Sequence, residues 1–375
     1  MADNLTVEEH TMAIFTGKLG QNKILFSEVT GALYNMILNQ EVESRTIGAG
    51  MASLIEEATR DVGLYGDRII KYFTDTLRVY DYEPDGSDQL NVLKTYRPKA
   101  PICEQMVVDT AKFIPLTLDN YLTKQGFADE ATFGAFNGVM QNWMRNTKKV
   151  YLAKEYNAFI GTTVAEGAAQ NIEVALSDAT DPEAKARIDA QSIAKAVADV
   201  FVKMTEDASR DYNDLEVEAC YDKDQLIMVW NAEALNKITL MDVPTLYKDN
   251  EVLGALKQNI RRLPAKYFGD IVTSGTTDGK THRALHQVEV GGKLYKAGDL
   301  YAAGLTIGEA VPCYQENATI LCKIIHKDAC PVLSGFETTT EFWNPSNLSR
   351  NDYLHFLFNS FDRFSGYPFV TIRSK

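Results

Sequence analysis

The chain has 375 residues, of which 45% are hydrophobic and 24% charged, a composition typical of a folded globular protein rather than a disordered one. Its formal net charge of −13 argues against a protein that grips nucleic acid along the phosphate backbone, because such proteins usually carry a basic face. No apolar run approaches the ~20 residues that span a bilayer, and the acidic opening MADNLTVEEH lacks the basic start of a signal peptide. We therefore expect a protein that folds in a cytoplasm, with no membrane partner.

The first clear feature after an irregular N-terminal segment is a long two-stranded excursion over about 65–120. The stretch YGDRIIKYFTDTLRVYDYE is rich in aromatic and β-branched residues, and it reaches a turn at Pro84, Asp85 and Gly86. The stretch DQLNVLKTYRPKAP then runs back. Because an isolated hairpin is marginal in water, we expect this ribbon to need a partner surface.

Two amphipathic helices follow, predicted over about 129–160 and 190–206. The first would be ~45 Å long, with Asp129 as its candidate N-cap. Apolar residues of the first helix recur at steps of three and four, which predicts one buried face with Trp143 on it. The members of this stripe are Phe133, Phe136, Met140, Trp143, Thr147 and Val150. The second helix has the stripe Ile193, Val197, Val200 and Met204.

The remainder of the chain mixes short strands and helices, which predicts an α+β fold. We expect a polar loop over 161–187, a strand–turn–strand unit over 214–230, and helix around AEALNKI and in part of 243–262. A hairpin is predicted on Gly291 and Gly292. The aromatic C-terminal tail predicts strands that are docked on the fold.

Three of the five cysteines gather around one histidine: Cys313, Cys322 and Cys330, with His326 among them. The run ATILCKIIHK is apolar and β-branched, which predicts a strand. Cys322, His326 and Cys330 would then be separated by ~13 Å steps, too far apart for zinc bonds of ~2.0–2.3 Å. We expect buried free thiols and no metal, and a zinc site stays open as the alternative.

The stretch TSGTTDGKTH at 273–282 resembles a phosphate-binding loop but fails its spacing. Ser274 occupies the first glycine position, Asp278 would oppose the phosphates, and no helix opens after Thr281. His282 and His286 have no evident third ligand. We therefore expect no catalytic site and no cofactor.

The order of these elements resembles the major capsid proteins of tailed bacteriophages, the Hong Kong 97-like (Johnson) fold. The phrases IPLTLDNYL before the first helix and KIIHKDACPVL before the C-terminal strands are similar to capsid sequences of short-tailed phages. By this resemblance the chain divides into consecutive segments. These are an N-terminal arm at 1–64, an extended β-hairpin loop at 65–124, a peripheral domain with the spine helix at 125–211, an axial domain at 212–318, and a return to the peripheral domain at 319–375.

The resemblance implies a major capsid protein that self-assembles, as hexamers and pentamers, into an icosahedral shell around double-stranded DNA. Its implied partners are other copies, a portal, a separate scaffolding protein, and packaged DNA bound without sequence specificity. The protein would lie in the virion after assembly in the host cytoplasm. As inter-subunit residues we expect Pro84, Asp85 and Gly86 at the hairpin tip, meeting Arg261 and Arg262 of a neighbour. An encapsulin-like compartment and a metal-dependent enzyme using the 313–330 cluster are the alternatives.

Overall fold

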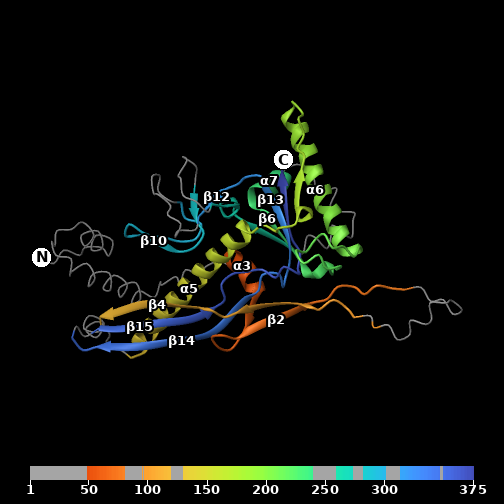
Figure 1. Cartoon of the computed structure of the whole chain (residues 1–375). Coiled ribbons are helices and arrows are strands. Elements are labelled where there is room, and N and C mark those ends of the chain that lie inside the picture. The colour runs from red at the N-terminus through yellow and green to blue at the C-terminus, as the bar shows by residue number, and fades with distance from the viewer. Residues whose placement is uncertain are drawn as a thin grey trace. The chain divides into compact units, whose positions relative to one another are not determined.

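The computed structural model describes residues 49–80, 95, 97–119, 130–239, 259–272, 282–300, 313–346 and 349–375. These residues form an α+β structure (Figure 1), and their contacts divide the chain into two units. Unit 1 comprises Met1–Met51, Thr110–Val150 and Gly335–Leu357; unit 2 comprises Ala52–Asp109, Tyr151–Ser334 and Phe358–Lys375. The consecutive five-segment division stays a prediction.

Unit 2 is built on a five-stranded mixed sheet in the order β5-β16-β13-β6-β7. Its strands are β5 Asn171–Val174, β6 Leu226–Asn231, β7 Ile260–Leu263, β13 Ile320–His326 and β16 Phe369–Ser374. The central strand β13 runs antiparallel to β16 and β6, and the outer strands β5 and β7 run parallel to their neighbours. Every residue of β13 is buried, which confirms the strand predicted there and shows that both of its faces are covered.

One face of this sheet is covered by α6 (Pro182–Glu206) and by the shorter α7 (Ala232–Thr239), as Figure 1 shows. The start of α6 is fixed locally, because Asp181 accepts a hydrogen bond from the Glu183 backbone and Pro182 suits the first helical turn. The predicted apolar stripe of this helix is confirmed. Its four members, buried against β6, β13 and β16, are Ile193, Val197, Val200 and Met204.

The C-terminal end of the long helix α5 (Glu130–Thr162) meets the other side of β13 through a buried lysine. Three carbonyl oxygens lie 2.8, 2.9 and 2.5 Å from Lys323 Nζ, those of Ile160, Gly161 and Thr163. A helix leaves its last carbonyl groups without intrahelical donors and concentrates negative partial charge there. Lys323 therefore caps α5. Burial, which penalises the ammonium form, lowers the pKa of Lys323 to about 7.

Gly161 allows a second close contact at the same helix end. A Cβ at this position would lie 2.0 Å from the Tyr267 carbonyl oxygen, so any other residue would push the two segments apart. Tyr267 ends the short 3₁₀ helix η5 (Ala265–Tyr267), which leads into a three-stranded sheet in the order β8-β12-β9. These strands are β8 Gly269–Val272, β9 His282–Ala284 and β12 Cys313–Glu316.

The hairpin predicted on two glycines is confirmed. Strands β10 (Val288–Val290) and β11 (Lys293–Tyr295) pair antiparallel, with Val290 opposite Lys293. Gly291 and Gly292 have φ angles of 60° and 77°, which a two-residue hairpin turn of this handedness requires and which glycine adopts without strain.

A further sheet has the strand order β1-β14-β15-β4. Its strands are β1 Thr59–Asp61, which follows α3 Ala49–Ala58, and β4 Thr110–Asp119, β14 Val332–Asn344 and β15 Ser349–Phe358. Within unit 1, α5 contacts this sheet through Lys148, whose Nζ lies 2.5 Å from a carboxylate oxygen of Glu337. Met140 and Met144 are the buried apolar residues of this part of α5.

The predicted register of α5 is wrong at Trp143, which is 52% exposed, while the prediction for Met140 is confirmed. The buried row continues from Met140 to Met144, a step of four residues, rather than to Trp143 by a step of three. The side chains of Phe133 and Phe136, and Asp129, lie outside the described residues. A stripe of mixed three- and four-residue steps thus located the helix but chose the wrong neighbouring row.

Two loop and strand predictions also need correction. The region 161–187 contains the 3₁₀ helix η2 (Ala168–Gln170), β5 and the start of α6, not an uninterrupted loop. Only the second strand predicted in 214–230 forms. Instead of the first, the Asn213 side chain bonds both the Val217 N–H (2.9 Å) and its carbonyl (2.7 Å), and Glu216 has a φ of 52°. In 243–262, the described end forms the strand β7, and the rest lies outside the described residues.

We expect Lys323→Met to lower the free energy of unfolding by roughly 2–5 kcal/mol, because capped carbonyls lose a buried donor. The folded-state pKa of about 7 lies below the ordinary value of 10.5, so the unfolded chain binds more protons between these values. The contribution of Lys323 to stability therefore rises with pH across this window, by up to about 1.4 kcal/mol per pH unit.

Denaturant unfolding at pH 7.0–8.5 tests both statements, with Lys327→Met as the control because Lys327 is the exposed lysine directly after β13. Equal stability and equal pH dependence of wild type and Lys323→Met would contradict the capping role.

The corrected helix register makes its own prediction. Met144→Ala should cost about 2–5 kcal/mol, because it leaves a cavity at a buried site, whereas Trp143→Ala should leave the stability of the isolated subunit nearly unchanged. Thermal unfolding of the two variants measures the difference. A larger loss for Trp143→Ala would restore the original register.

Candidate inter-subunit surfaces

The predicted excursion begins as a two-stranded antiparallel ladder of β2 (Arg68–Phe73) and β3 (Ile102–Val107). Its register runs from Arg68 opposite Val107 to Phe73 opposite Ile102. We call residues 68–107 the ribbon; among the described residues it has only these two paired strands. Side chains alternate along β2, with Ile70 and Tyr72 exposed and the intervening residues half-buried.

The inner face of the ribbon base packs on the same chain. The Phe73 ring meets the Tyr367 ring edge-on, with centroids 5.3 Å apart, and a Cβ at Gly366 would lie 2.4 Å from the Phe73 ring. Glu104 accepts a hydrogen bond from the Ser365 backbone at 2.9 Å. These contacts fix the first six residue pairs of the ribbon to unit 2.

Among the described residues of the ribbon after β2, an ionic clamp around Asp75 joins it to the body of the chain. Arg210 donates to Asp75 at 2.8 Å and lies 3.3 Å from Glu218, while Thr76 donates to Glu218 at 2.5 Å. The hydrogen bond from Arg210 lowers the pKa of Asp75, and the same pairing raises the pKa of Arg210. Because the pKa of Asp75 is lowered, the clamp is fully formed at pH values above the ordinary pKa of an aspartate. It weakens when the pH falls far enough to protonate Asp75.

Beyond the clamp, large apolar side chains are uncovered. Leu77, Val79 and Tyr80 are 71%, 91% and 55% exposed, and Arg78 lies over the Tyr80 ring at 5.1 Å. Single exposed apolar residues are common, but three within four positions form a patch of the kind that marks an interaction site. Leu77, Val79 and Tyr80 thus place exposed apolar surface at the described end of the ribbon.

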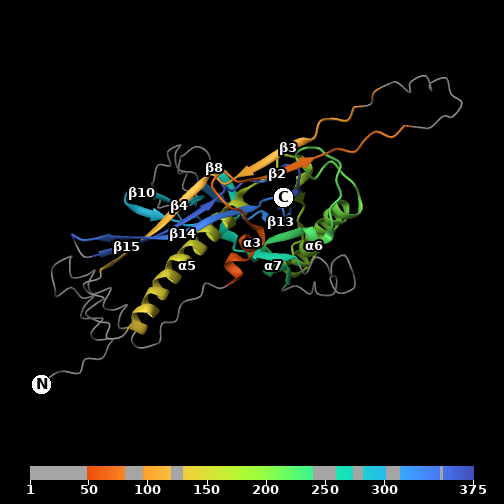
Figure 2. The ribbon, with the colours of Figure 1, turned by 90° about the horizontal axis from the view of Figure 1, so that it is seen from below.

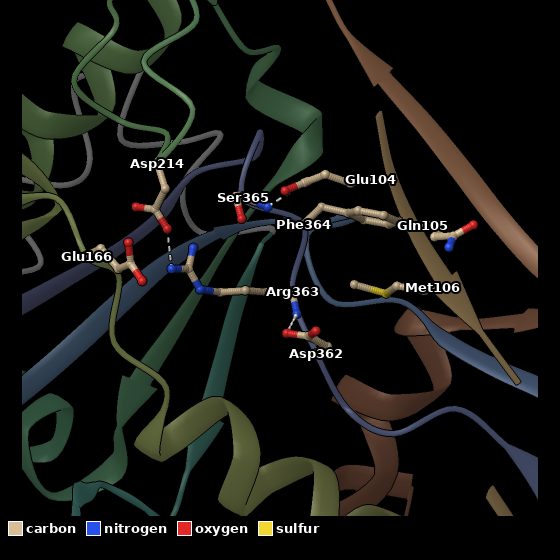
Figure 3. Close-up of a pocket in the computed structure, with 9 residues that line it drawn as sticks. All are labelled: Glu104, Gln105, Met106, Glu166, Asp214, Asp362, Arg363, Phe364 and Ser365. Carbon is tan, nitrogen blue, oxygen red and sulfur yellow. Dashed lines mark hydrogen bonds and ion pairs between the residues drawn. The ribbon is translucent and has the colours of Figure 1, made fainter. Parts of the chain in front are cut away.

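An open acidic pocket lies at the base of the ribbon, shown in Figure 3. Its volume is about 480 Å³, and it is lined by Arg363 and by carboxylates from four segments of the chain. They are Glu104, Glu166, Asp214 and Asp362. Arg363 pairs with Asp214, which also accepts from Gln170 at 2.7 Å, and Asp362 accepts from the Arg363 backbone. The pocket is therefore braced internally as well as acidic.

The predicted inter-subunit residues fall on two regions. Pro84, Asp85 and Gly86 lie outside the described residues. Arg261 and Arg262 are on β7, where Arg261 pairs with Glu57 of its own chain and Arg262 is exposed. The structure does not test whether either arginine meets a neighbour, so their assignment stays a prediction.

The cysteine and histidine cluster is spread over several elements. Cys322 and His326 lie on β13, whereas Cys330 follows the strand, contrary to the single continuous strand assumed for all three, and Cys313 lies on β12 of the smaller sheet. Burial raises the thiol pKa of Cys322 and of Cys330. His326 stacks on Tyr367 with centroids 4.3 Å apart, and burial lowers its pKa to about 4. Across the described ranges, no group of three or more potential ligands is arranged to hold a metal.

Other predicted motifs are only partly described. Residues 273–281 of the phosphate-loop-like stretch lie outside the described residues, between β8 and β9. His282 starts β9, and His286 Nδ1 lies 2.6 Å from the buried carboxylate of Glu155 on α5. Within the described part of the chain, no helix is long and apolar enough to cross a bilayer.

Sequence reasoning missed the clamp and the helix cap. Asp75 and Arg210 are 135 positions apart, so no local pattern joins them. The sequence did contain an indication of the helix cap, because Lys323 is the only charged residue in the apolar run ILCKII.

Two solved phage structures contain chains with folds similar to this one. One chain is from the capsid structure of Staphylococcus phage Andhra; it has a TM-score of 0.59 and 11% identity, and the match covers 85% of this chain and 83% of that chain. The other is from a structure of the head fiber and inner core protein gp22 of native bacteriophage P68; it has a TM-score of 0.57, 10% identity and the same coverage. At such identities the likeness shows the fold alone.

The family follows from a separate match. The model of the Phi29-like phage major capsid protein family matches residues 6–359. The chain belongs to this family and is a structural protein of the phage head shell. The encapsulin-like compartment and the metal-dependent enzyme are not favoured. No curated protein matches the chain.

We expect Arg210→Gln to loosen the ribbon beyond the clamp, because Asp75 loses its closest cationic partner. Amide hydrogen exchange should rise over 74–80 while exchange in β13 stays unchanged. Lys99→Gln is the control, because Lys99 is largely exposed and lies 3.8 Å from Asp75. Unchanged exchange over 74–80 in Arg210→Gln would show that the clamp does not hold the ribbon.

Proposed function

We propose that the ribbon lies across a neighbouring copy and joins subunits into the hexamers and pentamers of the shell. The observation that carries this proposal is the exposed apolar patch at Leu77, Val79 and Tyr80, directly beyond the Asp75 clamp. The clamp fixes the direction in which the ribbon leaves its own subunit, and the patch supplies apolar area for another surface. Fully burying an apolar side chain of this size contributes roughly 1.5–3 kcal/mol.

The geometry of such a contact suits a ring. A ribbon that leaves one subunit and is covered by a different surface of the next makes a heterologous contact, and contacts of this type generate closed rings when the rotation closes. The base of the ribbon packs on its own chain. Each copy would therefore keep its fold when the distal part of the ribbon moves from solvent onto a neighbouring copy.

The acidic tip adds a specific part to the proposal. In the segment YEPDGSDQL the turn residues Pro84, Asp85 and Gly86 are flanked by carboxylates, and we propose that they meet β7 of the neighbour. Arg262 is the better candidate there, because its exposed guanidinium remains accessible whereas Arg261 pairs with Glu57.

The remaining parts of the proposal concern partners and setting. The shell would enclose double-stranded DNA without sequence-specific contacts, since the net charge of −13 disfavours tight binding along phosphates. Assembly would take place in the host cytoplasm, with a portal and a separate scaffolding protein, and without catalysis by this chain. The segments 1–64, 65–124, 125–211, 212–318 and 319–375 would serve as arm, extended loop, peripheral domain, axial domain and return.

The double variant Leu77→Ser/Val79→Ser tests the ribbon. We expect its isolated subunit to unfold like wild type, because both side chains are exposed, and its assembly to require a markedly higher protein concentration. Negative-stain microscopy and sedimentation measure shell formation. Thr74→Ser, on the same ribbon, is the control.

The result that would defeat the proposal is shell formation by the double variant at the wild-type concentration. Loss of folding in the isolated subunit would instead show that the patch packs on its own chain, which equally removes its role between subunits.

A further inference from the structure

The long helix α5 has a charge pattern that sets it apart from the rest of the chain. The run between Glu130 and Glu155 is the longest stretch of the sequence without an acidic residue, although 51 of the 375 residues are Asp or Glu. The run lies entirely within α5. Its basic residues are Arg145, Lys148, Lys149 and Lys154. An acidic protein therefore carries one helix that is locally basic.

Packing within unit 1 decides which side of this helix faces outward. Met140 and Met144 are buried. Lys148 is directed to the sheet, where its Nζ lies 2.5 Å from a Glu337 oxygen and 5.4 Å from the centre of the Phe356 ring. In Figure 2 the strands β4, β15 and β14 lie together on one side of α5. A row that steps by four, three and four residues lies on the side of the helix turned away from these contacts, and its members are Gly138, Asn142, Arg145 and Lys149.

This row, which we call the basic row, is open. Gly138, Asn142 and Arg145 are exposed, and Lys149 is half-buried. The Arg145 side chain is 62% exposed, and its Nε lies 4.0 Å from Glu337, the carboxylate already paired with a lysine of the same helix. The guanidinium of Arg145 is therefore accessible from outside unit 1.

The basic row offers hydrogen-bond donors together with positive charge. Arg145 and Lys149 are cationic donors, Asn142 has amide N–H groups, and the neighbouring Trp143, which is 52% exposed, has an indole N–H. Phosphate oxygens are negative and accept hydrogen bonds, so they match this set of groups.

A protein surface matches the basic row less well. A helix that docks into a groove on another protein places apolar anchors three, four and seven residues apart. The four positions of the basic row hold no apolar side chain larger than glycine. The cores of protein interfaces are also depleted of lysine. Charge complementarity therefore selects a polyanion as the occupant.

We propose that the basic row of α5 contacts the phosphates of double-stranded DNA inside the shell. This inference rests on the proposed enclosure of DNA and names the surface that faces it. Arg145 and Lys149 are ~6 Å apart along the helix axis, and B-DNA carries one charge per ~1.7 Å of its axis, so the two cations can serve different phosphates of one duplex. The contact reads no base sequence, because it reaches the backbone alone. With few cations in a chain of net charge −13, it is weak and sensitive to salt.

Photo-crosslinking in filled shells identifies the occupant. We would place p-benzoylphenylalanine at position 142, on the basic row, and irradiate shells that contain DNA, with position 342 as the matched control. Phe342 on β14 is also exposed, and it alternates to the sheet face opposite the one on which Glu337 meets α5. DNA should be crosslinked from position 142 and much less from position 342.

The outcomes separate this contact from the enclosure on which it rests. Crosslinks from position 142 to protein alone, or equal DNA crosslinks from both positions, overturn the proposed contact and leave the enclosure of DNA intact. Shells recovered without DNA would defeat both.

Binding of free subunits to a short duplex of random sequence gives a second measurement. Arg145→Gln should weaken binding and reduce the slope of log affinity against log salt by about one, because one phosphate contact is lost. Arg145→Lys should keep the wild-type slope, since it keeps the charge. Arg262→Gln is the control, because Arg262 is an exposed arginine on another element, β7. A slope that is unchanged in Arg145→Gln, or reduced as much in Arg262→Gln, would contradict a contact made by the basic row.

Discussion

The capping of α5 by Lys323 is the contact on which the organisation of unit 2 depends. One ammonium group on the central strand β13 serves three carbonyl oxygens at the end of a 33-residue helix. Burying a lysine is costly, and this position is tolerated because the helix end presents concentrated negative partial charge and the Phe369 ring lies 5.3 Å away. With the helix end held on one side of β13 and α6 packed on the other, the strand is covered on both faces. Gly161 then lets the smaller sheet approach the same helix end through Tyr267.

The ribbon follows from this arrangement, since its base packs on the segment that leads into β16. Phe73 and Glu104 contact residues 365–367, immediately before β16 enters the central sheet. The Asp75 clamp adds partly exposed ion pairs, which contribute little stability each but are directional. A body with a buried, well-hydrogen-bonded core therefore carries an extension whose base is anchored and whose described apolar residues after Asp75 are exposed.

Local periodicity predicted the elements that are long or fully buried. The residues of β13 and the 190–206 part of α6 were found because period and burial agree there, whereas the first turns of α6, from Pro182, were wrongly predicted as loop. For α5 the same reasoning located the helix but misplaced Trp143, because rows separated by three and four residues diverge around the axis, and only the packing partner selects between them. The strand predicted over 214–220 was wrong for another reason. The Asn213 side chain makes hydrogen bonds with the Val217 backbone, and such side-chain bonds compete with strand pairing.

The candidate inter-subunit surface was also predictable from the sequence only in part. The exposed apolar patch of the ribbon could be anticipated, since a two-stranded extension cannot cover itself. The clamp that ends its anchored part could not, because Asp75 and Arg210 meet only after the sheet and α6 have been assembled. Lys323 was visible as a charge inside an apolar run, but its role depends on α5 ending beside it, a contact 160 or more positions away in sequence.

Charge distribution connects the core to the proposed assembly. Acidic side chains around the ribbon base are engaged within the chain: Glu104 accepts from a backbone amide, and Asp214 pairs with Arg363 and Gln170. Like charges on two copies of this acidic chain repel at short range, over a screening distance of roughly 8–10 Å. Copies of this chain can therefore approach closely only where carboxylates are absent from the contact or matched by a cation. An exposed arginine such as Arg262 opposite an acidic tip meets the second condition. Because both conditions are local, a strongly acidic subunit can stay apart from others in most orientations and still join them in the few that a shell requires.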